Sequence, residues 1–229
     1  MPMTISYTSR GVAITAELST PTGTPPRGLV VIAYGSDGLT DNLSGPWGTM
    51  IRGYADSLAQ AGFVALIPDY LGATKTPPGP TVFALIKEQR DYWQEAISDA
   101  VSHARSLPSV RATGVGLLGF SLGGHLCLRV PAKAKVLVEF FAPVLDGIGL
   151  LGTLTHAQIH HGKADQLPGT DFSNAEKIMN ILKSEGTSTE LFPYPGAGHG
   201  FIGNDPDNTN ARARSKERTM SFFGAHLSD

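Results

Sequence analysis

A serine between two glycines is the part of this chain with the clearest chemical meaning. Ser121 stands at the centre of Gly119-Phe-Ser-Leu-Gly123. The apolar run Thr113–Phe120 has the composition of a buried strand, and the residues from Gly123 onward begin an apolar helix. A sharp strand-to-helix turn holds such a serine in a strained backbone conformation, and the glycines let the strand and the helix approach closely. The pattern therefore predicts a nucleophilic serine.

A serine nucleophile needs a base, and the base needs an acid that orients it. The expected strand His156–His161 leads into Asp165, and the expected strand Thr189–Tyr194 leads into the glycine-flanked His199. In a parallel sheet, the residues that follow the strands gather at one edge, where sites form. The chain order therefore predicts Ser121 as nucleophile, Asp165 as acid and His199 as base.

Other residues are alternatives for two of these roles. Asp146, which follows an earlier apolar run, is the second candidate for the acid. His125 lies one turn after Ser121 but has no acid close to it in the sequence, so we expect it to pack or to line the pocket. His160 and His161 fall inside an expected strand, which favours structural roles.

Two backbone N–H groups are expected to bind the oxyanion that forms when a carbonyl is attacked. The first belongs to Leu122, directly after the nucleophile. The second is expected in the loop after the apolar run Gly28–Tyr34, where Ser36 is favoured and Gly35 is the alternative.

These residues require a scaffold in which strands alternate with helices. We expect an N-terminal hairpin over Thr4–Ser19, followed by a mostly parallel sheet covered by helices on both faces, which is the α/β-hydrolase fold in one domain, residues 1–229. The expected strands are Gly28–Tyr34, Phe63–Pro68, Thr113–Phe120, Lys135–Phe141, His156–His161 and Thr189–Tyr194. The expected helices are Trp47–Ala61, one or two within Thr81–Leu107, Ser173–Ser184 and Asn210–Leu227.

Composition narrows the function classes. The 229 residues carry a net charge of -2, which predicts neither a nucleic-acid partner nor an anionic membrane surface. The single cysteine, Cys127, excludes an internal disulfide and a multi-cysteine metal site, and it is expected to be buried. No metal or cofactor is expected. The start of the chain has no long apolar segment, so a cytoplasmic location is expected.

Several segments together resemble the dienelactone hydrolase family along nearly the whole chain. They are Val30–Ile32 with Gly38-Leu39, Ile51-Arg52, Leu58–Asp69, Ala96–Arg105, Val115–Gly124, His161–Asp165 with Pro168, Ala197–Phe201 and Glu217–Thr219. The resemblance implies an α/β hydrolase that acts on esters or lactones without a cofactor, with the triad Ser121, Asp165 and His199.

Two departures from the family's type enzyme concern the nucleophile. The type enzyme has cysteine where this chain has Ser121, and glutamate where it has Gly35. In the type enzyme that glutamate helps to control the thiol. A serine hydroxyl needs only the histidine base, so the two departures are consistent with each other.

Two further departures concern substrate charge. The type enzyme holds a substrate carboxylate with arginines, at positions where this chain has Gly203 and the segment Leu71–Ala73. Glycine and alanine cannot replace a bidentate arginine. Arg212 or Arg214 could substitute, although a place on the terminal helix surface is favoured. The expected substrate is therefore an uncharged or weakly polar small ester or lactone.

The functional prediction is a serine hydrolase that works through an acyl-enzyme, as a monomer or homodimer. The alternatives are a peptidase or acyltransferase with the same triad, and an inactive binding protein that retains the fold. The loop Asp37–Gly48 is expected to reshape the pocket mouth, and whether it forms a lid with Gly72–Pro80 is left open by the sequence.

Overall fold

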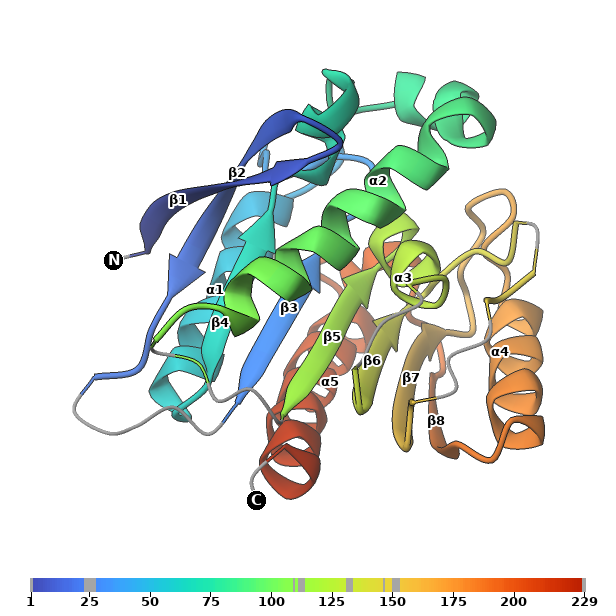
Figure 1. Cartoon of the computed structure of the whole chain (residues 1–229). Helices are drawn as coiled ribbons and strands as arrows, with labels where there is room; N and C mark the ends of the chain where they lie inside the picture. The colour runs from blue at the N-terminus through green and yellow to red at the C-terminus, as the bar shows by residue number, and fades with distance from the viewer. Residues whose placement is uncertain are drawn as a thin grey trace.

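The apolar runs form one eight-stranded sheet in the computed structural model, which describes residues 2–22, 28–108, 110, 114–130, 134–145, 147–149 and 153–227 (Figure 1). The strand order is β1-β2-β4-β3-β5-β6-β7-β8. Strands β1 and β2 form the N-terminal hairpin, β2 pairs antiparallel with β4, and all other pairs are parallel, as expected. The strands are β1 (Met3–Ser9), β2 (Val12–Ser19), β3 (Leu29–Ala33), β4 (Val64–Pro68), β5 (Val115–Phe120), β6 (Val136–Phe140), β7 (His156–Gly162) and β8 (Ser188–Tyr194).

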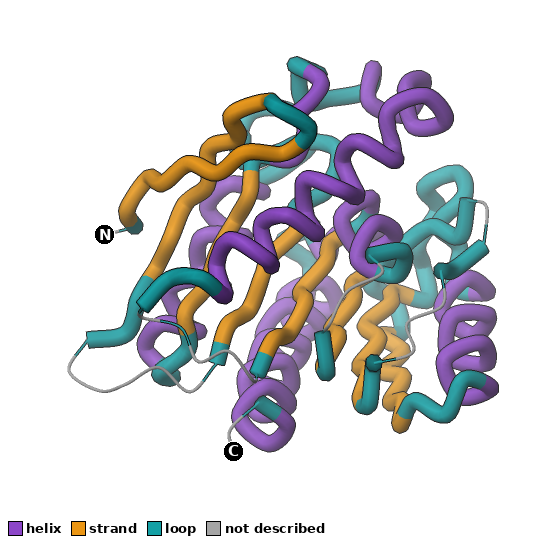
Figure 2. Tube along the Cα trace, viewed as in Figure 1, coloured by secondary structure: helices purple, strands orange, loops and turns teal. Residues whose placement is uncertain are grey.

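Helices cover both faces of this sheet. In Figure 1, α2 and α3 lie in front of it and α1 and α5 behind it, and Figure 2 shows the same layers as helix and strand. None of the described helices is long and apolar enough to cross a membrane. The helices are α1 (Trp47–Gln60), α2 (Thr81–Arg105), α3 (Leu122–Cys127), α4 (Ser173–Ser184) and α5 (Pro206–His226), with short 3-10 turns η1 (Tyr70–Thr74) and η2 (His199–Phe201).

Two helix boundaries refine the sequence prediction. The segment expected to hold one or two helices forms the single helix α2. Helix α5 begins at Pro206, four residues before the expected start at Asn210. The cause is local, because the Asp205 carboxylate accepts the Asn208 N–H at 2.9 Å and proline is favoured in the first turn of a helix.

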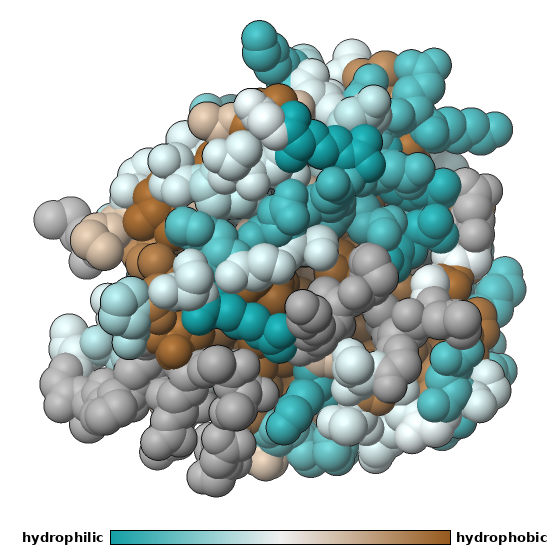
Figure 3. All heavy atoms as spheres, in the orientation of Figure 1, coloured by the Kyte–Doolittle hydropathy of each residue, from teal (hydrophilic) through white to brown (hydrophobic). Residues whose placement is uncertain are grey.

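The central strands are apolar because both of their faces are covered. Every residue of β3, β4, β5 and β6 is buried, as is typical of parallel strands between two helical layers. Side chains alternate between the layers, so that Phe120 and Phe140, neighbours in register, stack with ring centres 4.7 Å apart. A Cβ at Gly116 would meet the Phe223 ring at 2.7 Å, so α5 packs directly on β5 there. Figure 3 shows mainly hydrophilic residues along the outer surface of α2.

Candidate active site

The turn between β5 and α3 has the strained geometry that the sequence predicts. Ser121 has φ 51° and ψ −117°, a conformation that non-glycine residues rarely adopt. Its amide donates to the Phe140 carbonyl at 2.9 Å. A Cβ at Gly119 would lie 2.7 Å from the Gly123 carbonyl oxygen, and one at Gly123 would collide with the carbonyl oxygen of Ala33. Both flanking glycines are therefore required by close backbone approach.

Ser121, His199 and Asp165 form one hydrogen-bonded chain. The His199 Nε2 lies 3.1 Å from the Ser121 Oγ, and the His199 Nδ1 lies 2.7 Å from the Asp165 Oδ2. The three residues follow β5, β8 and β7, whose carboxyl ends meet at the same edge of the sheet. The structure thus brings together the three residues that the sequence selects. The distances allow a proton to pass from the hydroxyl to the imidazole.

The Asp165 carboxylate is fixed on both oxygens. Its Oδ1 accepts the Leu167 N–H at 3.0 Å and the Thr170 hydroxyl at 2.9 Å, while its Oδ2 faces His199. Burial acts to raise the pKa of Asp165, but hydrogen bonds from His161 and His199 outweigh it and hold the pKa well below the usual range. The group is therefore ionised and can stabilise an imidazolium at His199.

His161 also contacts this acid, although its place inside an expected strand indicated only a structural role. Its Nε2 lies 2.7 Å from the Thr170 carbonyl oxygen, so this nitrogen carries the proton, and it lies 3.4 Å from the Asp165 Oδ2. Burial acts to lower the pKa of His161, yet Asp165 and the buried Glu139 raise it. The available signal in the sequence was the four-residue spacing to Asp165, but strand register alone does not show which way this short segment turns.

Glu139 is a buried acid on the same side of the sheet as His161. It is fully inaccessible to solvent, and its Oε2 accepts the Ala142 N–H at 3.0 Å. Burial raises its pKa to about 7. Among the described residues, neither the Glu139 Oε1 nor the His161 Nδ1 has a hydrogen-bond partner. This carboxyl group therefore keeps its proton to a higher pH than an exposed glutamate does.

The two amides expected to bind an oxyanion lie beside the serine. Ser36 and Gly35 line the same cavity as Ser121, and Leu122 begins α3 directly after it. Within the described segments, neither the Leu122 nor the Ser36 N–H has a backbone acceptor outside regular helix and strand bonds. Leu122 and Ser36 therefore stay the predicted pair, with Gly35 as the alternative.

The cavity around Ser121 has a volume of about 310 Å³ and mainly apolar walls. The two loops considered as a lid supply part of its wall, and Trp47 is held there because its Nε1 donates to the Ser44 hydroxyl at 3.0 Å. No lysine or arginine is among the described residues that line it. These are Gly35, Ser36, Asp37, Ser44, Trp47, Pro80, Phe83, Ser121, Leu167, His199 and Ile202.

The remaining candidates from the sequence have other positions. His125 is buried with its Nδ1 3.1 Å from the Pro143 carbonyl oxygen. His160 is buried, and its two ring nitrogens form hydrogen bonds with the side chains of Tyr194 and Gln158, so it has the structural role that was expected. Cys127 is fully buried, as predicted. The alternative acid, Asp146, lies outside the described residues.

The positions considered for a carboxylate clamp lie away from the cavity. Gly203 does not line it, and a Cβ there would meet the Asn208 amide nitrogen at 2.6 Å, so an arginine at this position could not simply extend toward Ser121. Arg212 holds the backbone carbonyl of Gly203 at 2.6 Å, and Arg214 lines a different hollow. Neither arginine substitutes for the missing clamp in this geometry.

Comparisons with known proteins agree with this architecture. The family model for the dienelactone hydrolase family matches residues 14–227. A Synechocystis protein named "Putative carboxymethylenebutenolidase" is 26% identical over 206 residues, which cover 77% of this chain and 80% of that protein. An Aquifex aeolicus protein of the same name is 24% identical over 241 residues and covers 99% and 100%. A solved dienelactone hydrolase-like promiscuous phosphotriesterase from metagenomic libraries has the same fold, with a TM-score of 0.78 at 20% identity over 99% of this chain and 98% of its own.

Proposed function

This chain belongs to the dienelactone hydrolase family, and we propose that it hydrolyses an uncharged carboxylic ester or lactone through an acyl-enzyme on Ser121. The observation that carries the proposal is the hydrogen-bonded chain from the Ser121 Oγ through His199 to Asp165, with links of 3.1 and 2.7 Å. The names of the Synechocystis and Aquifex relatives, which describe a lactone hydrolase, support the same reaction class.

The first half of the proposed reaction forms the acyl-enzyme. The Ser121 Oγ attacks the carbonyl carbon while His199 Nε2 takes the hydroxyl proton, and Asp165 stabilises the resulting imidazolium. The negative oxygen of the tetrahedral intermediate accepts hydrogen bonds from the Leu122 and Ser36 amides. His199 then gives its proton to the leaving alkoxide, so that an alcohol departs, or stays tethered when the substrate is a lactone.

The second half releases the acid by the same groups. Water enters the cavity, His199 removes one of its protons, and the hydroxide attacks the acyl carbon. When the intermediate collapses, the proton returns to the Ser121 Oγ and the carboxylic acid leaves. No metal or cofactor is required for either half, since the histidine both accepts and returns the proton.

The lining of the cavity supports a neutral substrate. Apolar side chains of Trp47, Phe83 and Ile202 form much of the wall. Asp37, which also lines the cavity, carries an acidic side chain. A carboxylate that enters such a cavity loses its hydration without gaining a paired cation. The charge selectivity predicted from the missing arginines is therefore retained in the proposal.

The test combines turnover with labelling of the nucleophile. The wild-type protein should release p-nitrophenol from p-nitrophenyl acetate with an initial burst, and Ser121→Ala should lower kcat by about 10⁴ or more. A serine-directed phosphonate should modify Ser121 alone, as read by peptide mass spectrometry. Near-normal turnover in the alanine variant, or labelling at another residue, would overturn the assignment.

The alternatives from the sequence differ in measurable ways. An acyltransferase would pass the acyl group to an added alcohol or amine in preference to water, a peptidase would cleave amide substrates, and an inactive binding protein would show no burst. The small-molecule partner, the monomeric or homodimeric state and the cytoplasmic location stay predictions.

A further inference from the structure

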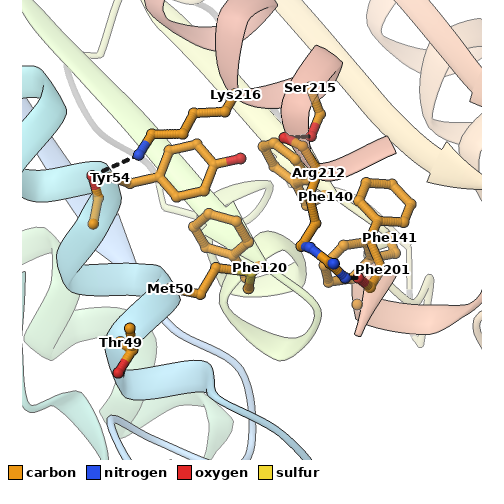
Figure 4. A pocket seen from close by; sticks show the side chains of 12 residues that line it. Thr49, Met50, Tyr54, Phe120, Phe140, Phe141, Phe201, Arg212, Ser215 and Lys216 are labelled. Carbon is orange, nitrogen blue, oxygen red and sulfur yellow. Dashed lines mark hydrogen bonds between the residues drawn. The ribbon is translucent and has the colours of Figure 1, made fainter. Parts of the chain in front are cut away.

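A second cavity lies between the sheet and helices α1 and α5 (Figure 4). Its volume is about 320 Å³, and it shares no lining residue with the cavity around Ser121. The wall is aromatic, with Tyr54 from α1, Phe120 and Phe140 from the sheet, and Phe201 from the turn after His199. Each of these side chains is at least 96% buried.

A hollow of this size and polarity is suited to a small apolar group. Protein interiors contain few voids larger than a water molecule, and wall atoms that face a void lose dispersion contacts. An apolar cavity also offers water few hydrogen bonds, so it can take up a hydrocarbon. Ligand sites range from about 300 to 1,000 Å³, and the cavity's 320 Å³ fits a short alkyl chain or a single ring.

Two cations from α5 line this apolar space. Lys216 reaches across it, as Figure 4 shows, and donates to the Gly53 carbonyl at 3.1 Å while lying 5.5 Å from the centre of the Tyr54 ring. Arg212, one turn earlier, donates to the carbonyls of Phe201 and Gly203. In the parts of the chain that the structure describes, neither cation forms an ion pair with a carboxylate. Arg212 and Lys216 are four residues apart on α5, a spacing at which like charges repel, so a bound anion would reduce this repulsion.

We propose that this cavity binds a small amphipathic carboxylate, with its hydrocarbon part against the aromatic wall and its carboxylate on Lys216. An ammonium group has three donors, and Lys216 uses one of them on Gly53, so two remain for an anion. Arg212 adds positive potential while it holds the turn after His199. The occupant would touch Phe141. The Phe141 ring packs edge-on against the ring of His199, the proposed base, with 4.8 Å between the ring centres. This binding does not rest on the proposed hydrolysis.

Two glycines allow each cavity to be filled separately. A Cβ at Gly53 would have the Lys216 Nζ as its nearest atom, at 3.8 Å, so Gly53→Leu should fill the second cavity without a clash and with a gain in helix propensity. A Cβ at Gly35 would lie 3.5 Å from the Ser121 Cβ, so Gly35→Leu should fill the catalytic cavity. Lys216→Gln removes the charge alone, and Lys183→Gln, on the exposed side of α4, is the matched control.

The experiment is titration calorimetry of the full chain with octanoate, and with octanol as the uncharged counterpart. We expect one octanoate per chain, binding about tenfold or more weaker in Lys216→Gln and for octanol. Binding should be absent in Gly53→Leu and unchanged in Gly35→Leu and Lys183→Gln. The proposal is overturned if the wild type takes up no octanoate at millimolar concentration, if octanol binds equally well, or if Gly35→Leu removes the binding. Should Gly53→Leu fail to fold by circular dichroism, Lys216→Gln decides alone, and unchanged affinity there would refute it.

Discussion

Replacing Asp165 with asparagine should move the proton of His199 to the wrong nitrogen. In the native protein, Asp165 Oδ1 accepts the Leu167 N–H at 3.0 Å and the Thr170 hydroxyl at 2.9 Å. An asparagine must place its amide oxygen there, because its NH₂ group would otherwise face the Leu167 N–H. The NH₂ group then occupies the Oδ2 position, 2.7 Å from the His199 Nδ1.

In that arrangement the asparagine donates to Nδ1, so the proton of the neutral imidazole lies on Nε2, which faces the Ser121 Oγ at 3.1 Å. A protonated Nε2 cannot accept the serine proton. The new NH₂ group also faces the N–H of His161 at 3.4 Å, so a repulsive contact replaces an attractive one. We expect kcat to fall by about 10⁴, or roughly 5 kcal/mol of transition-state stabilisation.

The assay is steady-state hydrolysis of p-nitrophenyl acetate by Asp165→Asn, with the thermal midpoint measured by circular dichroism to show that the variant is folded. Asp146→Asn is the control, because the sequence makes Asp146 the alternative acid, and its kcat should change little. A loss smaller than about tenfold in Asp165→Asn, or a larger loss in Asp146→Asn, would refute the reasoning.

Three further predictions concern charge, pH and packing. A neutral methyl ester should exceed its free-acid analogue by about tenfold or more in kcat/KM, or about 1.4 kcal/mol, and a preference for the acid that fades with salt would contradict this. Burial keeps the pKa of Glu139 at about 7 against 4.5 without it, so between these values the folded state holds a proton that the unfolded chain releases. The free energy of unfolding should therefore fall as pH rises through this window, by up to about 3 kcal/mol. Urea titrations at about pH 5 and 7.5 measure this difference, and in Glu139→Gln the unfolding free energy should change less between the two pH values. In Gly123→Ala the new Cβ would collide with the Ala33 carbonyl oxygen, so the variant should lose about 2–3 kcal/mol of stability and part of its activity. An unchanged melting temperature would show that the turn accommodates the methyl group.

Much of the scaffold can be predicted from the sequence because it depends on local patterns of residues. Apolar runs bounded by glycine and proline predict the parallel strands, and the glycines around Ser121 predict the elbow, since both reflect steric limits of the backbone itself. The positions of Asp165 and His199 follow from one topological rule, namely that parallel strands end at a common edge. Their roles in catalysis stay predictions until the variants are assayed.

Features that depend on how a short loop turns, or on how far a helix stands from the sheet, could not be predicted from the periodicity of strands and helices. His161 was expected to be only structural, but the turn after β7 folds back so that it contacts Asp165. Gly203 stands where the family's type enzyme has a clamp arginine, but it does not line the cavity around Ser121, and a Cβ there would meet the side chains of Asp205 and Asn208. The hollow between α1 and α5 depends on how far two helices stand from the sheet, which periodicity does not encode.

The proposed nucleophile, Ser121, and the proposed base, His199, follow strands that the sheet supports very differently. Strand β5, which carries the elbow, is hydrogen-bonded on both sides, whereas β8, which leads to His199, pairs among the described strands with β7 alone and is only partly buried. Edge segments open locally at a lower free energy than the centre of a fold. Fraying of β8 would carry the imidazole away from an intact Ser121 elbow, so inactivation on warming should precede the loss of the sheet. The working lifetime of the enzyme would then be set by its last strand, and selecting variants only for a higher global melting temperature would miss the changes that prolong activity.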